Sequence, residues 1–281
     1  MKVYISVDAE GNSGIYNLWQ VMPGNREFDF ARRMMANDVN AAVRGAFNAG
    51  ATQVIVNDAH NNGNNLIIDM LDERVDLICG SVCPLGMAQG AELRADAAFL
   101  IGYHARKGSP GVISHSYAYG SMVEMRLNGR IISEHDLIGH AIGMFGTPVI
   151  FLTGDDKVTA EAREFIPGLY TVETKVCISD NAAMCHHPAR VAGEIEQTAG
   201  KALRNFRSDG IKPLRIDGEV KLDVRFSSAT QAMLACKAPD ASLEEDNLVR
   251  FCGPDYSTVS HAFMIGISLA GGFRDDAALY H

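Results

Sequence analysis

The sequence lacks the long apolar runs and the clusters of basic residues that mark two large classes of protein. None of its apolar stretches reaches the roughly 18 residues of a membrane-spanning helix, and no signal-peptide pattern opens the chain. Its 25 Lys and Arg face 34 Asp and Glu, for a formal net charge of -9, whereas binding to nucleic acid requires clustered cations. We therefore expect a cytoplasmic protein that binds neither membranes nor nucleic acids.

Paired cysteines are also missing. The six cysteines include no C-x-x-C pair, so neither a disulfide framework nor a zinc ribbon is indicated, and we expect buried free thiols. With 281 residues, 47% of them hydrophobic and 21% charged, the composition is that of a soluble globular protein. This length suffices for one large or two ordinary domains with a sizeable core.

What the sequence does contain is a series of short apolar runs separated by helical patterns. The runs at 3–5, 52–56, 97–101 and 148–153 are typical of buried strands, and apolar residues recur at helical spacing over 28–47. Strand, helix and strand in succession predict a right-handed parallel crossover. We expect an α/β fold, with a three-layer, mostly parallel sheet domain over residues 1–207.

The remainder of the chain predicts a second, smaller domain. Residues 207–210 are polar and turn-rich, and residues 208–281 are expected to form a small α+β domain that takes part in assembly. Within the first domain, Asn128-Gly129 suits a tight turn between two strands over 122–133. A helix is expected to start near Glu134.

Acidic residues and histidines stand where the apolar runs end. Because the carboxyl ends of parallel strands line one crevice, we expect these side chains to lie together. Imidazole mixed with carboxylate suits zinc, with manganese or cobalt as substitutes. Each position alone is weak evidence, and their joint occurrence carries the hypothesis of a metal-dependent enzyme. The expected ligands are Asp8, Glu10, His60, His104 and Glu134.

The charge of this ligand set favours two metal ions over one. Three carboxylates carry -3 and two divalent cations carry +4, so a bridging hydroxide would bring the site to neutrality. Asp8, on the first and central strand, is the natural bridge between ions about 3.5 to 4 Å apart.

Other polar residues near the strand ends have more than one interpretation. His115 lies in a loop rich in Gly and Pro, where it could act as acid or base or stabilise an oxyanion, or be an ordinary surface histidine. Asp58 could orient His60 or cap a helix. Asp155 and Asp156 need no catalytic role if they cap the helix that follows.

Several of these motifs together resemble one known family. The chain resembles the zinc-dependent D-aminopeptidase family, which was historically labelled as dipeptide transport proteins. The motifs that carry the resemblance are Val7-Asp8-Ala9-Glu10-Gly11, Val56 to His60, Gly102 to Arg106 and Ser114-His115-Ser116. The resemblance covers nearly the whole chain. It implies two zinc ions per subunit held at Asp8, Glu10, His60, His104 and Glu134, a catalytic role for His115, and a ring-like homodecamer that encloses its active sites.

We therefore expect a dinuclear zinc aminopeptidase that releases the N-terminal residue from short peptides, with D-amino-acid peptides among its substrates. A dinuclear phosphoesterase, another small-amide hydrolase and a non-enzymatic peptide-binding protein are the alternatives. The phosphoesterase is disfavoured because its usual Asp-x-His and Gly-Asn-His-Asp/Glu signatures are missing. The sequence leaves open the D or L selectivity, the preferred side chain and peptide length, and the native metal.

Overall fold

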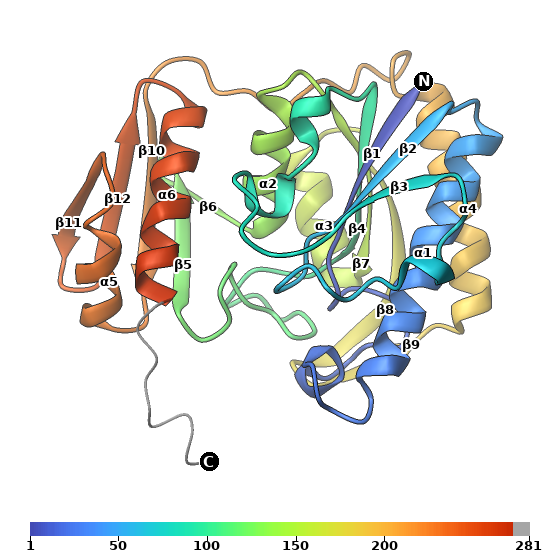
Figure 1. Cartoon of the computed structure of the whole chain (residues 1–281), viewed down its shortest axis with the longest axis horizontal. Helices are drawn as coiled ribbons and strands as arrows, with labels where there is room; N and C mark the ends of the chain where they lie inside the picture. The colour runs from blue at the N-terminus through green and yellow to red at the C-terminus, as the bar shows by residue number, and fades with distance from the viewer. Residues whose placement is uncertain (272–281) are drawn as a thin grey trace. The chain divides into compact units, whose positions relative to one another are not determined.

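The alternating strands and helices build a mostly parallel sheet. The computed structural model describes residues 1–271, and its larger sheet has the order β3-β2-β1-β4-β7-β8-β9 (Figure 1). All neighbouring pairs are parallel except β8 and β9. The strands are β1 (Lys2–Val7), β2 (Gln53–Asp58), β3 (Val75–Ile78), β4 (Ala97–Tyr103), β7 (Val149–Asp155), β8 (Tyr170–Ser179) and β9 (Ala182–Cys185).

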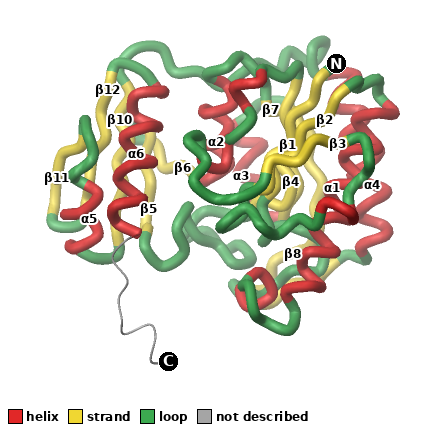
Figure 2. The backbone as a smooth tube through the Cα atoms, in the orientation of Figure 1, coloured by secondary structure: helices red, strands yellow, loops and turns green. Residues whose placement is uncertain are grey.

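Helices cover both faces of this sheet (Figure 2). Helices α1 and α4 pack against each other on one side, and a side chain at Gly45 would place its Cβ 2.4 Å from the Glu196 carbonyl oxygen. Strands β4 and β7 are buried along their whole length, as expected for central parallel strands between helices. The helices are α1 (Phe28–Asn48), α2 (Glu134–Gly143), α3 (Asp156–Phe165) and α4 (Pro188–Asn205), with short 3-10 helices η1 (Leu18–Val21), η2 (Ile68–Met70), η3 (Gly86–Ala88) and η4 (Ala91–Leu93).

The second sheet is antiparallel, with the order β11-β12-β10-β5-β6. Its central strand alternates, because Leu222, Val224 and Phe226 are fully buried while Asp223 pairs with Arg250. Asn128 and Gly129 both have positive φ at the β5–β6 turn, so the predicted hairpin is confirmed. The elements are β5 (Met122–Leu127), β6 (Arg130–Ile132), β10 (Val220–Phe226), α5 (Ala229–Ala235), β11 (Ala241–Glu245), β12 (Leu248–Gly253) and α6 (Tyr256–Gly271).

The chain forms two compact units, one of residues 1–114 and 134–215 and one of residues 115–133 and 216 onward. Their bounds differ from the expected division into 1–207 and 208–281. The β5–β6 hairpin belongs with the C-terminal segment because β5 pairs with β10, and the chain leaves the larger unit after Arg215. A role of the smaller unit in assembly stays a prediction.

Two further expectations concern cysteines and membranes. All six cysteines are free, but Cys79 and Cys185 are exposed and the others are partly exposed, so the expectation of buried thiols is wrong. Among residues 1–271, no helix is both long enough and apolar enough to cross a membrane.

Candidate metal centre

The parallel register of three strands brings four of the expected ligands to one edge of the sheet. Val7, the last residue of β1, pairs with Asp58 of β2 and with Ile101 of β4. The residues that follow these positions therefore leave the sheet side by side. They carry Asp8, Glu10, His60 and His104, and Glu134 joins them from the first turn of α2.

The five side chains form two linked groups around Asp8. His60 Nδ1 lies 3.1 Å from Asp8 Oδ1 and 3.3 Å from Glu10 Oε2. His104 Nε2 lies 3.4 Å from Asp8 Oδ2 and 3.1 Å from Glu134 Oε1. The two oxygens of Asp8 thus face different histidines, which is the arrangement that a bridging carboxylate requires.

Burial and like charge raise the pKa of the central carboxylate. Asp8 is 2% exposed, and its desolvation together with the charge of Glu10 raises its pKa to about 7. Burial lowers the pKa of His104, but Glu134 and Asp8 outweigh it and raise that pKa to about 10. In the same way Glu10 and Asp8 raise the pKa of His60 well above its ordinary value, against the effect of burial. The site therefore attracts positive charge.

The donor set fits a transition-metal ion. Asp8 Oδ2 is buried and accepts no hydrogen bond from the described residues, although His104 Nε2 lies 3.4 Å away, so this oxygen is available to a metal ion. Asp8, Glu10 and His104 offer ligand atoms that all lie within 4.8 Å of one another. Two histidines and three carboxylates are a typical set for zinc and chemically similar ions.

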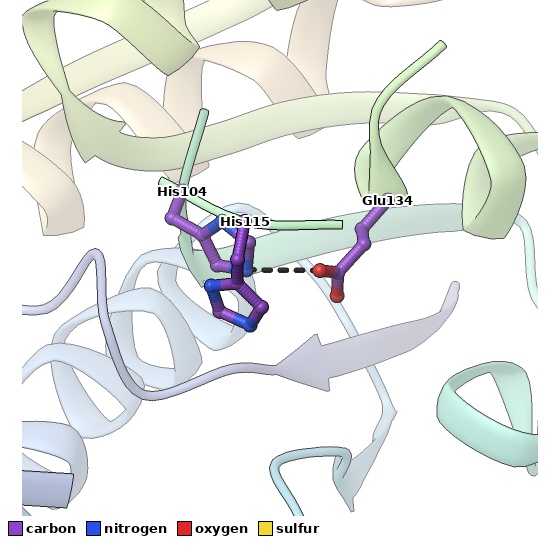
Figure 3. A group of neighbouring side chains, drawn as sticks. All are labelled: His104, His115 and Glu134. Atoms are coloured by element: carbon purple, nitrogen blue, oxygen red, sulfur yellow. Dashed lines mark ion pairs between the residues drawn. The ribbon is translucent and has the colours of Figure 1, made fainter. Parts of the chain in front are cut away.

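His115 belongs to a second candidate group of metal-binding side chains, with His104 and Glu134. The loop before it is held by hydrogen bonds from Val112 N to Asp155 Oδ2 (2.6 Å) and from Ser114 N to Asp180 Oδ1 (3.2 Å). His115 follows Ser114 directly in the chain. It is buried, and its ring lies near His104 and Glu134, with ligand atoms within 4.8 Å (Figure 3). His115 is therefore no surface histidine.

Asp58 supports the loop that carries His60 through hydrogen bonds to Asn65. Its carboxylate accepts hydrogen bonds from Asn65 N (2.6 Å), Asn65 Nδ2 (2.9 Å) and Leu66 N (2.7 Å), and Asn65 Nδ2 also donates to the His60 carbonyl oxygen. Asp58 thus neither caps a helix nor binds the His60 ring in the described structure. It shapes the loop from which His60 projects.

Asp155 caps helix α3, as expected, and also accepts a hydrogen bond from the loop before His115. Its Oδ1 accepts from the backbone N–H groups of Lys157 and Val158 at the start of α3. Its Oδ2 binds Val112 in the loop that leads to His115. Asp156 instead accepts from Cys177 N on β8.

Sequence reasoning missed two residues of β8 beneath the site, Thr174 and Lys175. Lys175 is fully buried, and its Nζ donates to the carbonyl oxygens of Glu10 (2.6 Å) and Asn12 (2.7 Å). Thr174 Oγ1 donates to the Gly11 carbonyl oxygen at 2.6 Å, which is nearer than the alternative acceptor, the Gly154 carbonyl oxygen at 3.1 Å. The sequence around Lys175 does not distinguish it from a solvent-exposed lysine, because its hydrogen-bond partners lie more than a hundred residues away in the chain.

The fold and the site define the class: an α/β protein with candidate metal-binding groups at the carboxyl edge of a parallel sheet. The particular group follows from the sequence, because the model of the D-aminopeptidase family matches residues 1–265, and the chain belongs to that family. This confirms the expected family and the α/β fold class. It also confirms the assignment as an aminopeptidase, which hydrolyses peptide bonds.

Two relatives match nearly end to end. A D-aminopeptidase of Bacillus subtilis (strain 168) is 34% identical over 271 residues, which are 96% of this chain and 98% of that protein. The solved structure of the Zn-dependent D-aminopeptidase DppA from Bacillus subtilis, described as a self-compartmentalizing protease, has a TM-score of 0.92 at 34% identity. That match covers 97% of this chain and 99% of DppA.

Proposed function

We propose that this protein is a dinuclear zinc aminopeptidase that releases the N-terminal residue from short peptides, including peptides of D-amino acids. The observation that carries the proposal is the position of Asp8 between two histidines, each of which has a second carboxylate beside it. The similarity to a zinc-dependent enzyme supports the choice of metal. Manganese or cobalt would suit the same donors.

Each ion would have its own ligands and share Asp8. Asp8, Glu10 and His60 would hold one ion, and Asp8, His104 and Glu134 the other. Two such ions, when bound, would supply Lewis acidity for the scissile carbonyl and for an attacking water. Three carboxylates leave a surplus of one positive charge against two divalent ions, and protons on His60 and His104 must leave when metal binds.

His115 is proposed to be the catalytic acid and base. With five other side chains available as ligands, its imidazole can take a proton in the first step and donate one to the leaving amine nitrogen, or stabilise the oxyanion. Its burial keeps bulk water from competing for that proton. The ligand atoms of His115 also lie within 4.8 Å of those of His104 and Glu134, and the zinc content of His115→Ala distinguishes a ligand from an acid and base.

The remaining parts of the proposal concern assembly and location. We propose that the protein assembles into a ring-like homodecamer that encloses its active sites, supported by the self-compartmentalizing description of DppA. Short peptides would be its only substrates, because a closed ring admits little else. A cytoplasmic location remains a prediction from the sequence.

One set of assays tests the reaction. The zinc-loaded protein is given paired D- and L-alanyl amides, D- and L-dipeptides and a phosphodiester, and its zinc is counted per chain. We expect close to two zinc ions, cleavage of amides and dipeptides with D faster than L, and an intact phosphodiester. Cleavage of the phosphodiester alone, or inert behaviour towards every peptide at full zinc loading, would overturn the proposal.

A further inference from the structure

Two of the proposed ligands belong to a buried loop that has little secondary structure of its own. The ligand loop, residues 8–12, follows β1, and its side chains Asp8 and Glu10 are 2% and 1% exposed. Main-chain polar groups buried in such a loop require partners, because leaving one unsatisfied costs about 1 to 3 kcal/mol. The partners of these groups therefore show what holds the loop in place.

Every carbonyl of the ligand loop has a donor, and the donors are of two kinds. Within the loop, Asn12 Nδ2 donates to the carbonyl oxygens of Asp8 (2.6 Å) and Ala9 (2.9 Å). From outside, the two β8 side chains Thr174 and Lys175 donate to the remaining three carbonyls, of which only Asn12 O also accepts from the main chain, from Ile15 N at 3.3 Å. Lys175 alone reaches two of these, at Glu10 and Asn12.

This contact spans the sheet. Strands β4 and β7 lie between β1 and β8 in the strand order, so no ladder hydrogen bond joins β8 to the ligand loop. The loop can pass close to β4 because residue 11 is glycine: a Cβ there would lie 2.0 Å from the Tyr103 carbonyl oxygen. Thr174 and Lys175 therefore make a connection that the sheet itself does not provide.

Burying an ammonium group is costly, since desolvation of one ion costs several kcal/mol. A side chain that only filled space here would be apolar. The ammonium group instead supplies charge-assisted hydrogen bonds to two carbonyls of one short loop, and such bonds are stronger than neutral ones. Fixing the Glu10 carbonyl fixes the peptide plane next to the Glu10 Cα, and hence the position from which its side chain reaches His60.

We propose that Thr174 and Lys175 are positioning residues of the metal centre, which hold the main chain of the ligand loop so that Glu10 and Asp8 keep the spacing that two metal ions require. This inference rests on the proposed function, because it assumes that Asp8 and Glu10 bind metal. It adds two residues from a strand that contributes no ligand.

Substitutions that keep size but remove a donor test the proposal. Thr174→Val removes the hydroxyl from a side chain of the same shape, and Thr174→Ser retains it. Lys175→Met removes the ammonium group at similar length. Thr171→Val is the matched control on β8, because the Thr171 hydroxyl accepts from exposed Arg163, and Lys157→Met is the control for a lysine that pairs at the surface.

Three measurements are made on each protein: zinc affinity by chelator competition, the visible absorption of the cobalt-substituted protein, and thermal unfolding of the metal-free protein. We expect Thr174→Val and Lys175→Met to bind zinc about 10 to 100-fold more weakly, with altered cobalt bands. Thr174→Ser and both controls should match the wild type.

Zinc affinity and cobalt bands equal to wild type in folded Thr174→Val protein would overturn the inference, and this variant decides the question if Lys175→Met does not fold. A loss of affinity in Thr174→Ser equal to that in Thr174→Val would also overturn it, because the hydroxyl would then not matter. If the wild-type protein itself binds no zinc, the proposed metal centre and this inference both fail. Wild-type zinc binding with unaffected variants removes the inference alone.

Discussion

At the scale of single residues, Asp8 and His115 have different proposed roles, one as a shared metal ligand and one as an acid and base. Replacing His115 with Ala should leave the zinc content and the fold unchanged and reduce turnover by about 10² to 10⁴, the range for a positioned acid or base. Asp8→Ala, which removes the shared carboxylate, should lose both ions. Zinc content and peptide turnover are measured on the same preparations. Zinc lost together with activity in His115→Ala would make His115 a ligand.

Protons compete with metal for the same side chains. Zinc requires an ionised Asp8, with a pKa of about 7, and a neutral His104, with a pKa of about 10. A fall in pH favours the protonated form of both groups, so zinc affinity should fall from about pH 8 to about pH 6. At the higher pH binding should release protons, because His104 still carries one. Calorimetry in two buffers of different ionisation enthalpy measures this release; zinc uptake that is independent of pH would contradict the assignment.

At the scale of elements, the start of α3 and the loop before His115 are joined by one carboxylate. In the wild type, Asp155 Oδ2 accepts a hydrogen bond from Val112 N at 2.6 Å. Asp155→Asn keeps one side-chain oxygen for the helix cap but places an NH₂ group, which cannot accept a hydrogen bond, opposite Val112 N–H. We expect unchanged zinc content and a loss of turnover up to about 10²-fold, the cost of a misplaced catalytic group. Asp156→Asn, one residue along, is the control. Equal turnover in both variants would show that the loop does not depend on this bond.

At the scale of the whole molecule, the smaller unit carries exposed apolar residues on its helices. Met233 of α5 and Ile265 and Leu269 of α6 are 51%, 44% and 41% exposed, which favours cover by a neighbouring subunit. We expect a large symmetric oligomer that cleaves di- to pentapeptides and leaves folded proteins intact. Light scattering and digestion of a folded protein check this. A stable, fully active monomer would contradict the compartment and leave the metal chemistry standing.

Much of the fold and of the candidate site was predictable from short stretches of sequence. Strands buried between two layers of helices have continuous apolar sequences, and the carboxyl ends of parallel strands lie at the same edge of the sheet. Asp8, His60 and His104 therefore came together as expected, because each follows the end of its run within a few residues. The hairpin turn at Asn128 was equally local, because it depends on the backbone freedom of two residues.

The sequence by itself determined the family, the fold class and the residues that gather at the sheet edge, because each of these depends on local patterns of apolar and polar residues. Only the tertiary structure decided which distant groups support them. The β5–β6 hairpin joins the C-terminal sheet through pairing with β10, and Lys175 reaches the Glu10 carbonyl across 165 positions. A hydrogen bond between residues so far apart in the chain depends on the order of the strands in the sheet. The apolar periodicity within either segment does not predict it.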